Sequence, residues 1–350
     1  MNVRTLETLA IGASLLCLSA CGGGGSSPAM PSNAAGSLSQ SLARSGVSGV
    51  TYPFGALNGR TAAELTRSMT HRNGWISPEA KKVAGLVYFS NLGGNEIEIF
   101  KQVGKNQMPM GTITSGVNFP GGLTVDSKGN LYVVNEGANN VTVYAKGTTS
   151  PSLTYSTELS DCSDVAVAND GTVYIANFNG LKNGWVTVYP QGNISKVYQI
   201  TDFGGGAPLE VALDKHQNLY VEFDLNGNGS TAVNEYAPGS TTGTNLNLSF
   251  QFGAGVQVDK AGNVVVVQQV EPSEILVFPP GQTSPSKTIT LPNAGQPFAI
   301  AISKRGRVMF AGDSTHNLAQ SLMYPSGKFR YTIASGFQNP AGVAVSPAQY

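Results

Sequence analysis

The sequence predicts an all-β protein, and three observations lead to this prediction. Glycine occupies 43 of 350 positions, well above its usual share of about 7%. Aromatic and β-branched residues are plentiful nevertheless, so the glycines indicate turns between strands. From about residue 81 onward, strand-like segments return with a period of 42 to 46 residues. A period of this size indicates a fold built from repeated units.

Each repeat contains a buried apolar run that marks its second strand. An alternating segment such as LTVD (123–126) precedes the run, and a segment ending in an aromatic residue and a glycine turn, such as YAKG (144–147), follows it. Four short antiparallel strands in about 44 residues are typical of one propeller blade. The sequence therefore predicts a six-bladed β-propeller of four-stranded antiparallel blades. The six runs are LVYFSN (86–91), LYVVNE (131–136), VYIANF (173–178), LYVEFD (219–224), VVVVQQ (264–269) and VMFAGD (308–313).

The two ends of the repeat region predict how the ring closes. The first unit lacks an inner strand, because LVYFSN follows directly on the preceding segment. The segment NPAGVAVS (339–346) aligns with FPGGLTVD (119–126) and supplies one. We therefore expect the C-terminal strand to complete the first blade and to remove its open edge. A β-sandwich is the alternative architecture, but it has no reason to keep a period of about 44 residues.

The first 20 residues have the features of an export signal. Arg4 precedes an apolar stretch (9–18) that is too short to span a bilayer, and LSAC (18–21) ends it. LSAC resembles the lipobox of bacterial lipoproteins, which implies that Cys21 carries a lipid and becomes the mature N-terminus. An ordinary cleaved signal is the alternative, since small residues precede such cleavage sites as well. We expect an exported protein that is lipid-anchored in the bacterial cell envelope.

Residues 21–80 separate the anchor from the repeats. The stretch 22–50 is rich in Gly, Ser and Pro and predicts a flexible tether, and the lead-in that follows has no strong pattern. Within it, Trp75 and Ile76 are expected to pack against the next domain. The expected organisation is a signal peptide at 1–20, a tether and lead-in at 21–80 and the propeller at 81–350.

Charge and cysteine content bear on partners and stability. Lys and Arg total 21, Asp and Glu total 21, and 12% of residues are charged, so there is no basic footprint for nucleic acid. Cys17 leaves with the signal and Cys21 takes the lipid, so Cys162 has no partner for a disulfide and is expected to be a buried thiol. We expect a monomer that contacts the membrane through its lipid anchor.

The unit FPGGLTVDSKGNLYVVNEGANNVTVYAKG (119–147) resembles NHL repeats, and more loosely the gluconolactonase-like and streptogramin-lyase-like propellers. The resemblance covers 81–350. It implies a fold rather than an activity, because these families include lactonases, lyases and non-catalytic scaffolds. Several related enzymes depend on histidine, whereas this chain has only His71, His216 and His316, without a matching cluster.

Two acids stand at equivalent positions of adjacent inner strands. Asp164 and Glu210 directly precede apolar pairs where the other units have Gly or Ala, and both are expected to point at the channel mouth. Neighbouring carboxylates repel unless they are solvated, protonated or bridged by a cation. Gluconolactonase-like propellers hold a divalent metal at this location, which implies calcium or another divalent cation here, with a wet channel as the alternative. The turns after the second strands add the channel-mouth candidates Asn135, Asn177 and Asp313.

A second candidate metal site lies in DLNGNGSTAVNE (224–235). The segment fits the calcium-loop pattern, with Asp224, Asn226 and Asn228 as side-chain ligands and Glu235 at the twelfth place. Strands rather than helices flank it, and Glu235 falls inside a third strand. An ordinary long hairpin turn is the alternative interpretation.

Two classes of function fit these observations. The first is a lipid-tethered module that binds a protein, carbohydrate or small molecule through its loops without catalysis. The second is a metal-assisted hydrolase or lactonase that uses Asp164 and Glu210 in the channel. The sequence alone leaves the choice between enzyme and binding module open.

Overall fold

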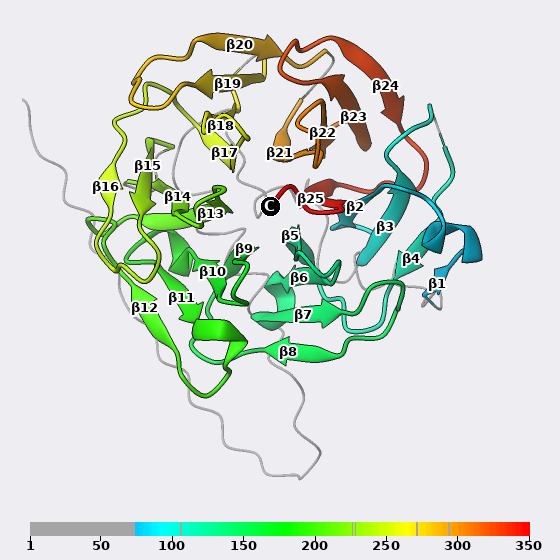
Figure 1. The fold of residues 1–350 in the computed structure, drawn as a ribbon, viewed down its shortest axis with the longest axis horizontal. Coiled ribbons are helices and arrows are strands. Elements are labelled where there is room, and N and C mark those ends of the chain that lie inside the picture. The colour runs from blue at the N-terminus through cyan, green and yellow to red at the C-terminus, as the bar shows by residue number, and fades with distance from the viewer. Residues whose placement is uncertain (1–73, 106, 226, 228, 271, 293–294) are drawn as a thin grey trace, which may run out of the picture. The chain divides into compact units, whose positions relative to one another are not determined.

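The protein is a ring of six antiparallel sheets, which confirms the six-bladed propeller (Figure 1). The computed structural model describes residues 74–350 except positions 106, 226, 228, 271, 293 and 294. The predicted signal peptide, Cys21 and nearly all of the tether lie outside the described residues. The six closed sheets exclude the alternative of a β-sandwich.

In the inner strands, which lie nearest the centre of the ring, apolar residues recur at alternate positions and face the neighbouring blades. Each inner strand contacts the inner strands of both adjacent blades, so the inner strands form a closed ring. Each also pairs with the second strand of its own blade. In blades 1 to 6 the inner strands are β25 (Pro340–Ser346), β5 (Pro120–Val125), β9 (Cys162–Val167), β13 (Ala207–Leu213), β17 (Gly253–Val258) and β21 (Pro297–Ile302). The second strands are β2 (Leu86–Asn91), β6 (Leu131–Asn135), β10 (Val173–Asn177), β14 (Leu219–Asp224), β18 (Val264–Gln268) and β22 (Val308–Asp313).

Two further strands complete each blade toward the outside of the ring. The third strands are β3 (Glu96–Lys101), β7 (Asn140–Tyr144), β11 (Trp185–Tyr189), β15 (Thr231–Tyr236), β19 (Glu274–Phe278) and β23 (Leu318–Met323). The outer strands are β4 (Gly111–Ile113), β8 (Leu153–Tyr155), β12 (Tyr198–Ile200), β16 (Thr244–Asn245), β20 (Lys287–Thr290) and β24 (Phe329–Ile333). Short 3₁₀ turns lie at Pro78–Lys81, Glu136–Ala138, Asn179–Leu181 and Pro190–Gly192.

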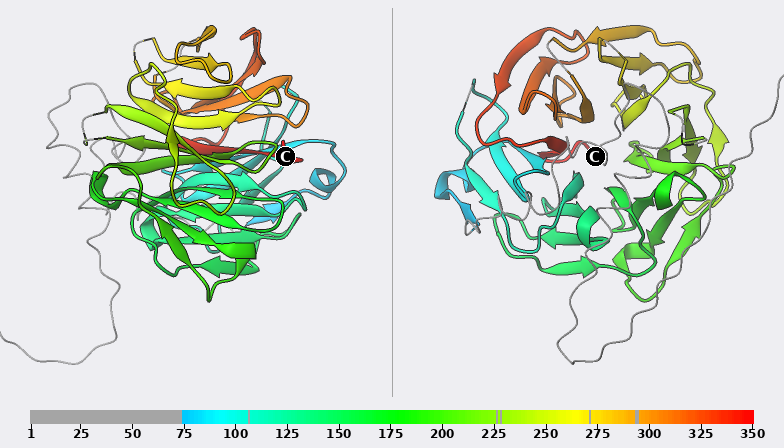
Figure 2. Two further views of the ribbon diagram at one scale, coloured as in Figure 1. Left: turned by 60° about the vertical axis from the view of Figure 1, so that its left-hand side comes forward. Right: turned by 180° about the vertical axis from the view of Figure 1, so that it is seen from behind.

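Blade 1 is closed by segments from both ends of the described chain. β25 pairs antiparallel with β2, with Val345 opposite Val87 and Val343 opposite Phe89, as the repeat alignment predicts. On the outside, β1 (Trp75–Ile76) pairs with β4 and adds a fifth strand. The expected packing against the domain is confirmed for Ile76, which packs on the cluster between blades 1 and 2, whereas the side chain of Trp75 is 48% exposed. The view from behind again places the C-terminus at the middle of the ring (Figure 2).

The hydrophobic core is divided into clusters at the interfaces between blades, one at each interface and a second, smaller one between blades 3 and 4. Tyr132, Tyr174 and Tyr220 occupy the same register in three second strands, and each is at most 8% exposed within such a cluster. This confirms that they are core residues. The propeller is thus stabilised by packing between blades, which makes closure of the ring essential.

The ring has two faces with different connections. The turn face carries the turns between inner and second strands, and the carboxylates of Asp126 and Asp259 cap two of these turns. The loop face carries the loops that enter the inner strands and those that join second and third strands. Within the part of the chain that the structure describes, no helix has the length and apolarity needed to cross a membrane.

Candidate functional site

The inner strands surround a central channel with a cavity of about 100 Å³. The last residues of the chain enter it, because Ala348, Gln349 and Tyr350 lie in its wall together with the inner strands. The Tyr350 hydroxyl donates to the Val258 carbonyl at 3.0 Å, and Gln349 Nε2 donates to the same oxygen at 3.3 Å. The tail follows β25 of blade 1, and these two hydrogen bonds hold it against blade 5.

Asp164 and Glu210 both lie in the channel wall, as the repeat alignment indicates. They are buried in it rather than exposed at its mouth, at 6% and 9% exposure. Asp164 Oδ2 accepts a hydrogen bond from the Val211 backbone N–H at 3.0 Å. A Cβ atom at position 122 would overlap Asp164 Oδ1, so Gly122 leaves the space that this carboxyl occupies. The small residues at the equivalent positions thus serve the close packing of inner strands.

The pKa values of the Asp164 and Glu210 carboxyl groups are both raised. Burial raises the pKa of Asp164 to about 7, although the backbone N–H groups of Val211 and Val165 lower it. Burial and the neighbouring Asp164 charge raise the pKa of Glu210 well above its usual range. A hydrogen bond between the two side chains lowers the pKa of Asp164 and raises that of Glu210, as expected when a protonated Glu210 donates to Asp164.

Two more buried acids, Glu136 and Glu222, extend this pair into a row. Glu222 stands opposite Glu210 in the β13–β14 register and is completely buried. Glu136 is also buried, and its charge acts on Glu210. We call Glu136, Asp164, Glu210 and Glu222 the buried acid row. The segment LYVEFD indicated that Glu222 is unusual, because an acid interrupts an apolar strand there. The sequence did not indicate which blade Glu222 contacts.

The carboxyl of Glu222 is enclosed without a partner. Both oxygens lack a hydrogen bond of normal length and angle. A Cβ at position 253 would overlap Glu222 Oε1, so Gly253 of blade 5 provides the space for it. The pKa of Glu222 is raised to about 8, mainly by burial; the backbone N–H of Gly255 lowers it, and the charges of Asp224 and Asp164 raise it. This side chain is therefore neutral in the folded protein at neutral pH.

Asn135 and Asn177 are buried loop clamps and do not line the channel. Asn135 Oδ1 accepts from the Asn118 N–H at 3.0 Å, and Asn177 Oδ1 accepts from the Ser160 N–H at 3.0 Å. In each case the amide at the end of the second strand holds the loop that enters the inner strand. Asn91 does the same in blade 1 with the Gln338 N–H, and Gln268 in blade 5 with the Gln251 N–H.

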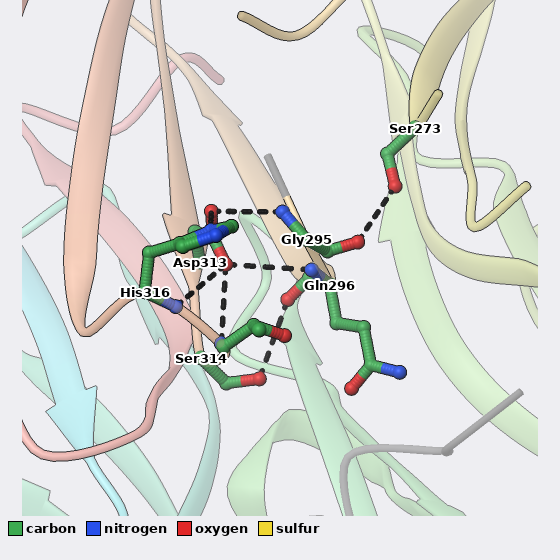
Figure 3. Close-up of polar contacts among 7 residues, drawn as sticks. Ser273, Gly295, Gln296, Asp313, Ser314 and His316 are labelled. Atoms are coloured by element: carbon green, nitrogen blue, oxygen red, sulfur yellow. Dashed lines mark hydrogen bonds and ion pairs between the residues drawn. The ribbon is translucent and has the colours of Figure 1, made fainter. Parts of the chain in front are cut away.

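Asp313 is the corresponding clamp of blade 6 (Figure 3). Its carboxylate is 1% exposed and accepts from the backbone N–H groups of Gly295, Gln296, Thr315 and His316 at 3.0 to 3.3 Å. Asp313 Oδ2 also lies 2.9 Å from Nδ1 of His316, whose side chain is 48% exposed. Asp313 therefore orients His316 on the loop face, a pairing that the sequence analysis did not anticipate.

The hairpin 224–235 separates two of the four predicted calcium ligands, Asp224 and Glu235. Asp224 is buried, and its carboxylate accepts hydrogen bonds from the backbone N–H groups of Gly227 and Gly229. Asn226 and Asn228 lie outside the described residues. Asp224 pairs with Thr231, whereas Glu235 pairs with Tyr220, four residues farther along β14 and roughly 13 Å away. Glu235 cannot be the twelfth ligand, because the antiparallel register directs it away from the loop.

Among the residues that the structure describes, no group of three or more His, Cys, Asp or Glu side chains is placed so that it could hold a metal ion. Cys162 is fully buried, as expected, and burial raises the pKa of its thiol.

No family model and no curated protein sequence matches the chain. Solved propellers are similar in fold. A structure of a nidogen/laminin complex matches at 15% identity and a TM-score of 0.63, over 76% of this chain and 100% of that one. Virginiamycin B lyase from Staphylococcus aureus matches at 16% identity and a TM-score of 0.53, over 77% and 86%. Kuenenia stuttgartiensis hydrazine synthase matches at 16% identity and a TM-score of 0.53, over 73% and 85%. These identities establish the shared fold alone.

Proposed function

We propose that this chain is a lipid-anchored binding module of the cell envelope whose loop face takes up a ligand or a protein partner. The observation that carries the proposal is the set of loop clamps. Asn91, Asn135, Asn177 and Asp313 are each at most 1% exposed and hold the loop of their own blade. These polar side chains hold the loops by hydrogen bonds and are not free to contact a substrate. Loops that are already ordered lose less conformational entropy when a ligand binds.

The architecture of one similar structure supports this proposal. Nidogen was solved in a complex with laminin, so a ring of this kind presents a surface to another protein there. The anchor follows from the LSAC segment at 18–21, since diacylated or triacylated cysteine binds membranes more strongly than a single chain does. The Gly- and Ser-rich tether would allow the propeller to reach partners away from the membrane surface.

A metal-assisted hydrolase or lactonase is the second candidate, and the position of Asp164 and Glu210 in the channel wall favours it. Thermal unfolding with millimolar calcium, magnesium or manganese separates the two proposals. The binding module predicts that none of these ions raises Tm through the channel. A rise in Tm that Asp164→Asn with Glu210→Gln abolishes would favour the hydrolase, because an ion that binds only the folded state stabilises it.

The anchor has its own test. The wild-type protein should carry a mass increase at Cys21 and partition with membranes, whereas Cys21→Ser should lose both. Membrane association of the Cys21→Ser protein at unchanged processing would contradict lipid anchoring, independently of what the loop face binds.

A further inference from the structure

A separate groove lies on the turn face between blades 4 and 5, with a volume of about 480 Å³. This volume falls in the range of small-molecule sites, about 300 to 1,000 Å³. One wall is polar and internally organised. Asn218 Nδ2 donates to Asp214 Oδ2 at 3.0 Å and to Glu235 Oε1 at 3.2 Å. Glu235, which cannot reach the hairpin loop, is thus held at the groove.

The facing wall is apolar because the outer strand of blade 4 ends early. β16 stops at Asn245, and the chain then crosses toward blade 5. The Leu246 N–H still donates to the Val233 carbonyl at 2.9 Å, whereas the Ser249 N–H donates to the Thr283 carbonyl of blade 5 at 2.8 Å. Leu246 and Leu248 remain partly exposed on this crossing and line the groove with Pro279 and Pro280.

The groove contains more acidic than basic side chains, with Asp214, Glu235 and Asp259 beside Lys215. The carboxylate of Asp214 accepts from the His216 N–H, the Asn218 N–H and Asn218 Nδ2, so the turn already uses it. Asp259 is used in the same way by its own turn and also accepts from the Tyr324 hydroxyl. This leaves one carboxylate, Glu235, and one exposed cation, Lys215, to meet a ligand.

We propose that this groove binds a neutral oligosaccharide. A pyranose ring presents C–H groups on one face and hydroxyl groups along its edge, which matches an apolar wall of Leu246, Leu248 and prolines opposite the polar wall of Asn218 and Glu235. A carboxylate and an amide can together accept from and donate to neighbouring hydroxyls. The inference does not rest on the proposed function, because the groove lies on the opposite face of the ring from the loops.

Other classes of ligand fit the walls less well. A lipid chain would remove water from the Glu235 carboxylate and give it no hydrogen bond beyond the one from Asn218, which costs free energy. An anionic ligand would meet three carboxylates against a single lysine. A neutral ligand with hydroxyl groups satisfies both walls.

Isothermal titration of the mature protein with chitotriose and cellotriose tests the proposal. We expect one of these trisaccharides to bind, and we expect Glu235→Gln and Leu248→Ser each to weaken binding by about tenfold or more, through loss of a charged hydrogen bond and of apolar contact, respectively. The matched controls are Glu274→Gln, on the third strand of blade 5, and Leu153→Ser, on the outer strand of blade 2. Both lie outside the groove and should bind like the wild-type protein.

Three results would overturn the inference. The first is that neither trisaccharide binds. The second is that the Glu235→Gln and Leu248→Ser proteins keep the wild-type affinity while circular dichroism shows them folded. The third is that the two control variants lose as much affinity as these proteins do. Asp164→Asn with Glu210→Gln should leave trisaccharide binding intact. A loss in that protein alone would place the binding in the channel and contradict the groove, whatever the loop face binds.

Discussion

Replacing Glu222 by Gln should stabilise the protein, and the gain should increase with pH. The side chain is 0% exposed, and neither oxygen has a normal hydrogen bond. Gln has nearly the same shape and fits the space beside Gly253, but it carries no charge at any pH. Glu222→Gln therefore removes the cost of burying a carboxylate while it keeps the packing.

The magnitude follows from the pKa. Burial raises the pKa of Glu222 from 4.5 to about 8, and at about 1.4 kcal/mol per pH unit this corresponds to an effect on the order of 3–5 kcal/mol. Because the folded state holds this proton more tightly than the unfolded chain does, the contribution is fully present below about pH 4.5. It is lost as the pH rises toward 8. Wild-type stability should therefore fall across this window.

Urea unfolding from about pH 5 to about pH 9 measures the difference directly. The free energy of unfolding of Glu222→Gln minus that of the wild-type protein should grow by roughly 3–5 kcal/mol across the range. Glu274→Gln, the same change at a half-buried position of β19, controls for loss of charge in general. A constant difference between Glu222→Gln and wild type at all pH values would refute the reasoning, because it would mean that Glu222 does not change its protonation on unfolding.

Two further predictions concern the ring and the loop clamps. Deleting 339–350 removes β25 with the buried Val343 and Val345, whose burial contributes about 1.5–3 kcal/mol each, and should lower Tm by roughly 10 °C or more in a thermal melt. Deleting only 347–350 should lower Tm much less. Equal Tm values for the 339–350 deletion and the wild-type protein would contradict closure by β25. Asn177→Ala should lower the free energy of unfolding in urea by about 2–3 kcal/mol, because it leaves the Ser160 N–H without its acceptor. The control, Asn193→Ala at an exposed position, should lower it by less than about 1 kcal/mol. Similar losses in the two variants would argue against the clamp.

The sequence was sufficient to predict the ring and its closure. Tyr132, Tyr174 and Tyr220 return at spacings of 42 and 46 residues, and all three are buried between blades as that period requires. The alignment of 339–346 with 119–126 likewise predicted that β25 pairs with β2. A repeat determines which residues occupy equivalent positions in successive blades, so it places strands and turns without knowledge of any side-chain contact.

Equivalent positions also located Asp164 and Glu210 in the channel, but not their chemistry. Whether two acids are solvated, protonated or bridged depends on burial, and burial depends on how closely Gly122 allows neighbouring inner strands to approach. The calcium-loop pattern at 224–235 was misleading for a related reason. Spacing along the chain matched, yet the antiparallel register carries Glu235 away from Asp224 and toward Asn218.

Contacts between blades were decided by the tertiary structure alone. Glu222 packs against Gly253 of the next blade, and Asp313 binds the loop at Gly295 and orients His316. The local sequence around Glu222 and Asp313 does not predict these contacts. The groove beside Glu235 exists because β16 ends after two residues and the chain crosses to blade 5. Periodicity specifies each blade from its own hydrogen-bonded strands, whereas the surfaces between blades form only when side chains far apart in the chain pack together.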